Sequence, residues 1–462
     1  MQKTADSSAS PFHLPNIRRF LLFRVLFNAR FYYPIFTVLF LDFGLSLEQF
    51  ALLNTVWAFT IVLAEVPSGA LADLMGRKRL LVSTTVLMMA EMSLIAFAPA
   101  GGGTLMFWLF LFNRVVSGLA EAMASGTDEA MAYDTLVEHG MADKWPLVLD
   151  WQMRLQSLGF ILAMTLGAMV YDHSLLNRAL AFLGLHWQIE QQLSMRLPIL
   201  LTLFFAFCAL LTTLGMREPL RHHDHAQEDS VKPQHGLVAL MALTLRAGGW
   251  ILRTPYALAI ILFAMTLDHI LRMLATLTSQ YYRLIDLPES SFGLIGSGIA
   301  IVGLAVPRLS RAMVARLSPG INVLLLSLAM LGSLIVLSWF IPYFGILPMA
   351  AAFTGMSMTS FFTSHYLNAI TSSSQRATVL SFKGMAFNVA YGCIGIGFAA
   401  LVRHERLLLS QHNPQAQESF LENTAFQAAI GWFPWYLAIL LVIVSLITLP
   451  RLRKQQNSPP LP

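Results

Sequence analysis

One connector in this sequence reads Gly69-Ala-Leu-Ala-Asp73-Leu-Met-Gly76-Arg77-Lys78-Arg79, and it lies between two long apolar segments. These segments cover about residues 48–67 and 80–99, and a helix needs about 20 apolar residues to cross a bilayer. Glycine tolerates the backbone angles of a tight turn, and Asp73 and Arg77 can form an ion pair at the membrane edge. The connector therefore predicts two consecutive membrane-spanning helices that are joined by a tight, charged turn.

Long apolar segments recur through the whole chain. Of its 462 residues, 56% are hydrophobic and only 12% are charged, whereas soluble domains carry about 25% charged residues. A soluble protein must keep a polar shell around its core and cannot bury this many apolar side chains. The sequence predicts an all-α membrane protein with twelve spans, at about residues 19–41, 48–67, 80–99, 106–132, 150–171, 195–215, 256–280, 290–307, 320–340, 345–367, 378–402 and 427–449.

Basic residues alternate between the connectors of these spans. With the N-terminus in the cytoplasm, the connectors around Arg77, Arg217 and Arg311 and the C-terminal Arg451 all lie on the cytoplasmic side, where membrane proteins collect Lys and Arg. The pattern predicts a multi-pass protein of the bacterial inner membrane with both termini cytoplasmic. The net charge of +5 has the same origin, because the chain lacks the basic stripe with interleaved aromatic residues that a nucleic-acid partner would need.

The longest cytoplasmic connector divides the predicted spans into two sets of six. We expect an N-terminal bundle at residues 1–216, a linker at 217–254 and a C-terminal bundle at 255–462. Within the linker, residues 237–246 have the pattern of an interfacial amphipathic helix. Gly69 precedes Arg77 by eight residues, as Gly303 precedes Arg311, and both pairs join the second and third spans of their sets. The sequence thus indicates two repeated six-helix bundles, which is a known plan of transporters.

Three separated motifs carry a resemblance to a known family. The connector at residues 69–79 resembles the signature Gly-x-x-x-Asp-(Arg/Lys)-x-Gly-Arg-(Arg/Lys) of the major facilitator superfamily, with Leu74 where a basic residue is usual. Arg114-Val-Val-Ser-Gly118 resembles the Arg-x-x-x-Gly element of the family's fourth span. Residues 125–134, 65–69 and 376–381 are similar to a bacterial branch. The resemblance covers essentially the whole chain.

The resemblance implies a fold and a gating device. The fold would be two six-helix bundles around a central cavity, and the connector would latch the bundles together in one state and release them in the other. The latch residues implied are Gly69, Asp73, Gly76, Arg77, Lys78 and Asp134. The Gly-Pro-rich element that many drug-expelling antiporters carry in span five is missing from residues 158–167, which weakens a drug-exporter interpretation.

Span four carries three ionisable residues, Arg114, Glu121 and Asp128, spaced seven apart, and Glu129 follows directly. Seven residues make nearly two helical turns, so the three lie on one face. A charge in the bilayer centre costs about 2.5–3.5 kcal/mol on insertion scales and therefore needs a partner or a water-filled cavity. These four residues are candidates for proton coupling or substrate binding in a cavity, which we favour over a polar seam between packed helices.

Spans seven and one add further candidates. Asp268 and Arg272 are four residues apart and can pair along their helix, and His269 beside them belongs to the residue type that titrates near neutrality. This group would couple protons, or it would be a fixed ion pair that locks two helices. Arg30 lies well inside span one, where it would hold an anionic substrate group beside an acid of span four or seven, or would pair structurally with Glu91 of span three.

Several aromatic residues lie in or directly beside the predicted spans. They are Phe31, Tyr32, Tyr33, Trp57, Tyr281 and Tyr282. They would line a pocket for a flat organic ligand, or anchor the protein at the lipid interface, which we favour for most of them.

Enzyme and metal motifs are lacking. The sequence has no phosphate-binding Gly-Lys-Ser loop, no zinc helix motif and no Gly-x-Ser-x-Gly elbow. Cys208 and Cys393 each lie inside an apolar segment and are expected to be buried, and the His222-His223-x-His225 cluster lies in a polar loop without four rigid ligands. We predict a protein that is not an enzyme and has no cofactor and no metal.

A secondary active transporter fits these observations. We expect it to move a small organic solute by alternating access, with protons as the coupling ion, as a monomer in the lipid bilayer, and with efflux favoured over uptake. Import or export of a siderophore-like metabolite is an alternative. From another class, a transporter-like sensor would bind a solute without moving it.

Overall fold

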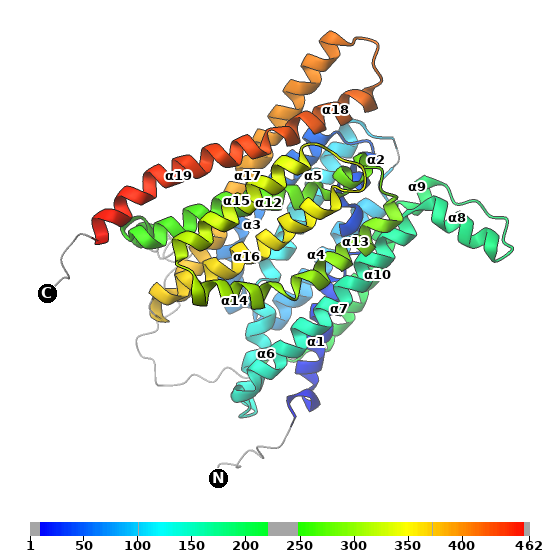
Figure 1. The fold of residues 1–462 in the computed structure, drawn as a ribbon. Coiled ribbons are helices and arrows are strands. Elements are labelled where there is room, and N and C mark those ends of the chain that lie inside the picture. Colours follow the sequence, from blue (N-terminus) through cyan, green and yellow to red (C-terminus); the bar gives the residue numbers. More distant parts are fainter. Residues whose placement is uncertain (1–9, 100, 220–247, 372, 457–462) are drawn as a thin grey trace.

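The computed structural model describes residues 10–99, 101–219, 248–371 and 373–456, with side chains for all of these except 66, 69, 70, 72–74, 373–378, 380, 381, 455 and 456. All regular secondary structure in the described residues is helical (Figure 1). The first half of the chain forms α1 (Pro15–Asn28), α2 (Phe36–Asp42), α3 (Leu47–Met75), α4 (Arg77–Ala96), α5 (Gly103–Ala124), α6 (Thr127–Glu138), α7 (Trp145–Tyr171), α8 (His173–Phe182), α9 (Gln191–Ser194) and α10 (Leu197–Gly215).

The second half forms α12 (Pro255–Leu284), α13 (Glu289–Gly303), α14 (Val306–Arg316), α15 (Pro319–Leu337), α16 (Ile346–Ile370), α17 (Ser373–His412), α18 (Glu418–Gly431) and α19 (Phe433–Gln456). Residues 248–253, before α12, are also helical. The amphipathic helix predicted at residues 237–246 and the His222–His225 cluster lie outside the described residues.

The first span is broken, contrary to the continuous helix that we expected at residues 19–41. It consists of α1, a 3-10 turn η2 (Tyr33–Ile35) and α2, so that eleven rather than twelve continuous segments of the described chain are long and apolar enough to cross a membrane. Two neighbouring helices hold the break. The free amide of Phe31 donates to Thr202 Oγ1 of α10 at 3.1 Å, and α7 approaches so closely that a Cβ on Gly167 would lie 1.7 Å from the carbonyl oxygen of Phe31.

Two other segments differ from the expected boundaries, and the cysteines differ from their expected burial. Span four ends at Ala124 and, after a turn in which Gly126 has a φ of 73°, continues as the separate helix α6. The loop expected at residues 403–424 is largely helical, because α17 runs on to His412 and α18 begins at Glu418, so that the two project as a hairpin (Figure 1). Cys393, expected to be buried, is exposed, and Cys208 is half-buried.

The two halves of the chain pack side by side along two seams, α3 against α17 and α7 against α13. Small residues allow the close approach at both. At the first seam, a Cβ on Gly395 would lie 2.3 Å from Thr55 Oγ1. At the second, a Cβ on Gly293 would lie 2.0 Å from the main-chain oxygen of Met164.

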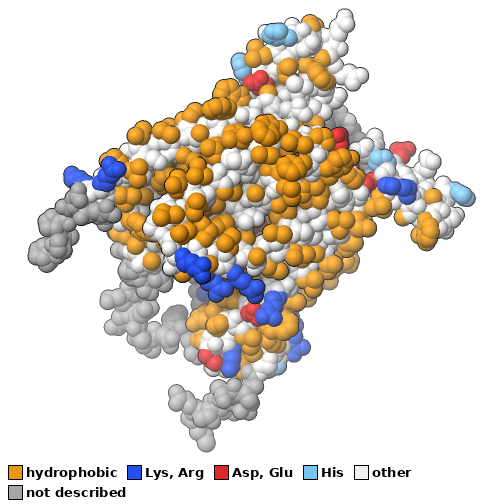
Figure 2. All heavy atoms as spheres, in the orientation of Figure 1, with side chains coloured by type: hydrophobic (Ala, Val, Ile, Leu, Met, Phe, Trp, Pro, Cys, Tyr) orange, Lys and Arg blue, Asp and Glu red, His pale blue; other side chains and the backbone are white. Residues whose placement is uncertain are grey.

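The two ends of the bundle differ in charge. We call the end at which α1 begins the α1 end, and the end at which α2 finishes the α2 end (Figure 1). In Figure 2 the face between the ends is dominated by apolar side chains, and Lys and Arg side chains gather along α14, which carries the exposed residues Arg308, Arg311 and Arg316. This apolar belt is what a lipid-embedded surface requires.

We expect Gly293→Ala to lower the stability of the protein, because the added methyl group would overlap backbone atoms of α7 that cannot rotate away. Overpacking of this kind costs about 1–3 kcal/mol. The matched control is Gly298→Ala in the same helix, where a Cβ would meet nothing within 4 Å. Alanine there should leave stability unchanged or raise it by up to about 1 kcal/mol through helix propensity. The thermal unfolding midpoints of the two variants in nanodiscs test this, and equal midpoints would contradict the seam.

Candidate functional site

A cavity of about 740 Å³ lies between the two halves, a size that suits a drug-sized organic molecule. Helices of both halves and the broken segment of the first span line it. Nine of its lining residues are aromatic: Tyr32, Tyr33, Phe36, Trp57, Phe160, Tyr282, Phe292, Phe353 and Tyr391. Our preference for lipid-interface anchoring is therefore wrong for Tyr32, Tyr33, Trp57 and Tyr282. Phe31 and Tyr281 are buried away from the cavity, Phe31 against Phe205 and Tyr281 against Phe340.

Five charged residues line the same cavity: Arg30, Arg114, Glu121, Asp268 and Arg272. All five are among the candidates predicted from the sequence. The arrangement brings candidates of spans one, four and seven around one space, although Arg30 of span one and Asp268 of span seven lie more than 200 residues apart in the chain. The partners of each side chain decide which of the five carries a free charge.

Arg30 is neutralised by a structural partner. It lies in the break of the first span and forms a buried ion pair with Glu91 of α4, whose side chain is 0% exposed. Of the two alternatives that the sequence left open, the geometry corresponds to the structural pair with Glu91 rather than to a pair with an acid of span four or seven. Arg30 thus contributes shape and polarity to the cavity wall but no net charge.

Asp268 and Arg272 also neutralise each other. Arg272 Nη2 lies 2.7 Å from Asp268 Oδ2, and its Nη1 donates to Asn388 Oδ1 of α17 at 2.8 Å. His269 does not join them. Its ring faces α19, where Nε2 lies 3.1 Å from the hydroxyl of Tyr436, and it does not line the cavity. His269 therefore forms no hydrogen bond with Asp268 or Arg272 in the described residues, because adjacent residues on a helix point about 100° apart. A role of His269 in proton coupling stays a prediction.

Arg114 is the cation without an acidic partner. It is 3% exposed, and its Nε and Nη2 donate to Asn113 Oδ1 at 3.1 and 2.8 Å. Its guanidinium lies 5.5 Å from the ring centre of Phe36 and 5.3 Å from that of Phe40. Asn113 is fixed in turn, because its Nδ2 donates to the main-chain oxygen of Glu91 at 2.6 Å. Among the described residues no carboxylate pairs with Arg114, so a buried positive charge stays uncompensated in the cavity wall.

Glu121 is the corresponding free acid. Its side chain is exposed, into the cavity, and has no ion pair in the described part of the chain. The row of charged residues predicted along span four does not continue from Glu121 to Asp128. The turn at Gly126 rotates α6, and Asp128 is buried there against Arg24 of α1 at 2.9 Å, with Glu129 3.5 Å from the same guanidinium. The polar-seam alternative thus describes Asp128, whereas the cavity interpretation describes Arg114 and Glu121.

Two smaller cavities adjoin the central one toward the α1 end. One of about 380 Å³ shares Glu121 with it and is lined also by Arg24 and Glu129. The other, of about 650 Å³, shares Tyr33 and Phe160. The central cavity therefore continues toward the α1 end of the bundle.

The latch residues lie at the α1 end. Arg77 forms an ion pair with Asp134 of α6 and donates to the main-chain oxygen of Ala130 at 2.6 Å. Glu218 accepts hydrogen bonds from the main-chain amides of Arg77 and Lys78 at 2.9 and 2.8 Å, and so caps the start of α4. The turn before α4 requires Gly76, whose φ is 89°.

The first part of the latch is not described at the side-chain level. Gly69 and Asp73 belong to α3, but the structure describes only the backbone at these two positions. The same holds for Arg376 at the start of α17. The ion pair expected between Asp73 and Arg77 therefore remains a prediction. The described contacts of Arg77 all lie within the first half of the chain.

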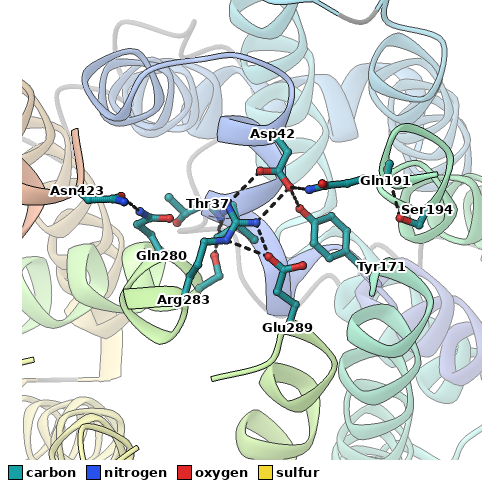
Figure 3. Close-up of polar contacts among 11 residues, drawn as sticks. Thr37, Asp42, Tyr171, Gln191, Ser194, Gln280, Arg283, Glu289 and Asn423 are labelled. Atoms are coloured by element: carbon teal, nitrogen blue, oxygen red, sulfur yellow. Dashed lines mark hydrogen bonds and ion pairs between the residues drawn. The ribbon is translucent and has the colours of Figure 1, made fainter. Parts of the chain in front are cut away.

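A polar cluster joins the two halves at the α2 end (Figure 3). Both oxygens of Asp42 accept from Arg283 of α12, at 3.0 and 3.1 Å, and Arg283 Nε donates to Glu289 at 2.9 Å. Tyr171 and Gln191 also donate to Asp42. Because Asp42 belongs to the first half and Arg283 to the second, this cluster closes the α2 end.

Further contacts support that closure around the rim. Thr37 Oγ1 donates to the main-chain oxygen of Thr276 at 2.5 Å, and Arg406 Nε lies 3.1 Å from Glu48 Oε1. Burial alone would raise the pKa of the Asp172 carboxyl, but hydrogen bonds from Ser174 and Ser290 outweigh it and hold the pKa below its ordinary value. Since Ser290 lies in the second half, ionised Asp172 adds to the closure at neutral pH.

The cavity is thus closed at one end and continues toward the other. Contacts between the halves, such as those of Leu47 with Glu422, Thr55 with Gly392 and Asp42 with Arg283, lie at the level of the cavity or toward the α2 end. The cluster around Asp42 and Arg283 was missed from the sequence, because both lie near predicted helix ends where charges are usual. Asn113 was missed as well, although its position next to Arg114 was a usable signal.

Comparison with known proteins agrees with this architecture. The sequence profile of the Major Facilitator Superfamily matches residues 20–400. A bacterial homologue of the human lysosomal transporter Spinster, in an inward-facing, unoccupied conformation, superposes with a TM-score of 0.71 at 14% identity, over 96% of this chain and 98% of that chain. The nucleoside transporter NupG superposes with a TM-score of 0.66 at 15% identity, over 93% and 97%. A D-xylose–proton symporter gives 0.57 at 13% identity, over 92% and 96%.

At these identities the structural similarity shows the fold alone. No curated protein sequence matches the chain significantly. The match of the family profile covers most of the chain, and the fold of the similar structures is the one that the sequence predicted.

We expect Asp42→Asn to open the α2 end. The substitution keeps the shape but removes the charge that pairs with Arg283, and a hydrogen bond to a charged group contributes about 1.5–3 kcal/mol. The ratio of closed to open molecules should fall at least about tenfold. Spin labels at the exposed Phe182 and Phe420, one on each half, report the change as a longer distance by double electron–electron resonance.

The control for this measurement is Asp286→Asn at the same end. Asp286 is exposed and has a φ of 62°, which asparagine also adopts readily. The labelled distances should not change in this variant. An unchanged distance distribution in Asp42→Asn would show that the cluster does not hold the two halves together.

Proposed function

Since the chain belongs to the major facilitator superfamily, we propose that it is a proton-coupled secondary active transporter of a small organic solute, which it moves through the central cavity by alternating access. The protein is a membrane transporter and not an enzyme. The coupling ion and the orientation in the membrane are parts of the proposal, and each is supported by a separate feature.

Proton coupling is supported by Glu121. It is the carboxylate that lines the cavity without a basic partner among the described residues, whereas Asp268 is paired with Arg272 at 2.7 Å. A carboxylate without an ion pair can bind and release a proton without breaking an existing pair. Its charge state then alters the electrostatics of the cavity and hence the balance between open states. The similarity of fold to a D-xylose–proton symporter supports the idea that this scaffold accommodates proton coupling.

Alternating access is supported by the contrast between the two ends. In our proposal the α1 end faces the cytoplasm, since Arg77, Arg311 and Arg316 lie there and basic residues collect on that side. The cavity then opens inward while the Asp42 cluster closes the outer side. Transport would require the cluster to separate and the latch around Arg77 to bring the halves together at the α1 end.

The direction of transport follows from how solute and proton affect one another. Efflux driven by the proton gradient requires that the solute and the proton compete for the cavity, whereas uptake requires that they bind together. The efflux that we favoured from the sequence needs a solute that prefers ionised Glu121. A transporter-like sensor would bind its solute in the same cavity without flux, but it would have no use for a cluster that must open and close.

We expect Glu121→Gln to abolish proton-driven transport while leaving the fold intact, because the amide keeps the size of the side chain and cannot exchange a proton near neutral pH. Inverted membrane vesicles with a pH-sensitive dye, supplied with a panel of solutes, measure this. A transported solute should collapse the proton gradient in the wild type and produce less than about a hundredth of that rate in the variant.

The matched control is Glu190→Gln, which alters an exposed carboxylate outside the cavity and should transport like the wild type. Normal gradient collapse in Glu121→Gln would refute the coupling role of Glu121. Solute flux that needs no proton gradient in the wild type would refute proton coupling itself.

A further inference from the structure

The charges of the central cavity balance in a way that indicates the class of solute. Two of the three arginines in the wall are neutralised, Arg30 by Glu91 and Arg272 by Asp268. The charges that remain are one cation, Arg114, and one carboxylate, Glu121. The cavity is therefore neutral when Glu121 is ionised and carries one positive charge when Glu121 holds a proton.

Arg114 has three features of an anion-binding side chain. Its side chain is 3% exposed and lines the cavity, its Nε and Nη2 are held by Asn113, and no described carboxylate pairs with it. A guanidinium stays charged in proteins, so its charge cannot be removed by losing a proton. Held in this way in the cavity wall, its guanidinium can bind a carboxylate, which Arg binds with good geometry and strength.

The wall around Arg114 favours an aromatic ligand. The rings of Phe36 and Phe40 already pack against its guanidinium at 5.5 and 5.3 Å, and Phe36 also lines the cavity. Trp57 and Tyr391 contribute further ring surface to the same space. Aromatic ligands gain from offset or edge-to-face contacts with such rings in addition to the area they bury.

From these observations we infer that the solute is an aromatic carboxylate whose anionic group binds Arg114, and that it enters the cavity together with a proton on Glu121. This inference rests on the proposed function, because it names the solute of the same cavity. It also specifies the direction of coupling. Solute and proton bind together and cross together, so an inward proton gradient drives uptake rather than the efflux favoured from the sequence.

The linkage between solute and proton is electrostatic. Arg114 and Glu121 are seven residues apart on α5, which separates a bound carboxylate from Glu121 by on the order of 10 Å. At that distance, and with an effective dielectric constant near 20, two like charges disfavour each other by roughly tenfold in an equilibrium constant. The bound anion therefore makes protonated Glu121 about tenfold more favourable, and a proton on Glu121 favours the anion by the same factor.

Other charges near Glu121 do not reverse this mutual preference of the bound anion and the proton on Glu121. The nearest charged or titratable groups on the packed elements are Arg24, Arg30, Glu91, Asp128 and Glu129, together with the hydroxyl of Tyr33. Arg30 is paired with Glu91, and Arg24 with Asp128 at 2.9 Å and Glu129 at 3.5 Å. The second carboxylate on Arg24 leaves one negative charge, which favours protonated Glu121 just as the bound anion does.

The test uses three ligands with one ring system and different charge: 2-naphthoate, 2-naphthamide and 2-naphthylmethylammonium. Each is titrated by calorimetry into the full chain in nanodiscs at pH 6 and pH 8, in two buffers with different ionisation enthalpies, so that proton uptake is counted. We expect naphthoate to bind at least about tenfold more tightly than the amide, to bind with uptake of up to one proton, and to lose up to about tenfold in affinity as the pH rises and Glu121 ionises.

Two variants separate the roles. Glu121→Gln should keep the naphthoate affinity of the low-pH wild type and lose both the proton uptake and the pH dependence. Arg114→Gln should lose the preference for naphthoate and keep binding of naphthamide. If Arg114→Gln does not fold, Arg114→Lys serves instead, since it keeps the charge and loses the planar fork. The control Arg154→Gln alters an exposed arginine of α7 and should bind like the wild type.

Several results would overturn the inference: equal affinity for naphthoate and naphthamide, preference for the ammonium ligand, affinity that rises with pH, or no binding of any of the three. These results leave the proposed function standing if vesicles still show proton-linked flux of another solute. Conversely, proton-linked naphthoate binding without flux in vesicles would support the solute class and refute transport. The two proposals can therefore fail separately.

Discussion

Within a bilayer, a peptide group that leaves the helical ladder must find another hydrogen-bond partner, and the first span shows how this chain meets that demand. Its helix stops at Asn28 and resumes after η2, and Thr202 accepts the hydrogen bond of the freed Phe31 amide. Gly167 allows α7 to cover the freed carbonyl. The break turns Arg30 inward, where it pairs with Glu91. This ion pair is the first of a series of linked polar contacts in the cavity wall.

That chain of contacts continues into α5. The main-chain oxygen of Glu91 accepts from Asn113, and Asn113 holds Arg114. Two arginines in the same cavity wall thereby acquire different properties, because Arg30 pairs with a carboxylate and Arg114 with an amide. An amide oxygen orients a guanidinium but leaves its charge uncompensated. A carboxylate orients the guanidinium and also neutralises its charge. The free charge of the cavity is thus a consequence of which side chains meet, and not of how many arginines the spans contain.

The two kinds of contact between the halves suit a moving protein. Along the seams, glycines such as Gly293 and Gly395 bring backbones together without long side chains that interlock, so that one half can rotate against the other. At the α2 end, the closure depends on polar side chains around Asp42, whose contacts can be exchanged for water when the halves separate. In the proposed alternating-access motion, the seams would stay packed while the polar contacts of the cluster open and close.

The sequence by itself determined that the chain spans a membrane, how many spans it has within the limits of one broken helix, and which residues near Arg77 turn the chain between α3 and α4. These properties follow from local composition, because a span needs only enough consecutive apolar residues and a turn needs only its glycine. The sequence also selected all five charged residues of the cavity, since a charge inside an apolar segment is costly wherever it points.

Only the tertiary structure decided what those charges do. Helical periodicity placed Asp128 on the face of Glu121, but the turn at Gly126 sends it to Arg24, and His269 faces Tyr436 although it adjoins Asp268. The break in the first span and the cluster of Asp42 with Arg283 join residues from distant parts of the chain. Charge pairing depends on distances of 3 to 4 Å between side chains of different helices, and the order of residues along one helix does not contain those distances.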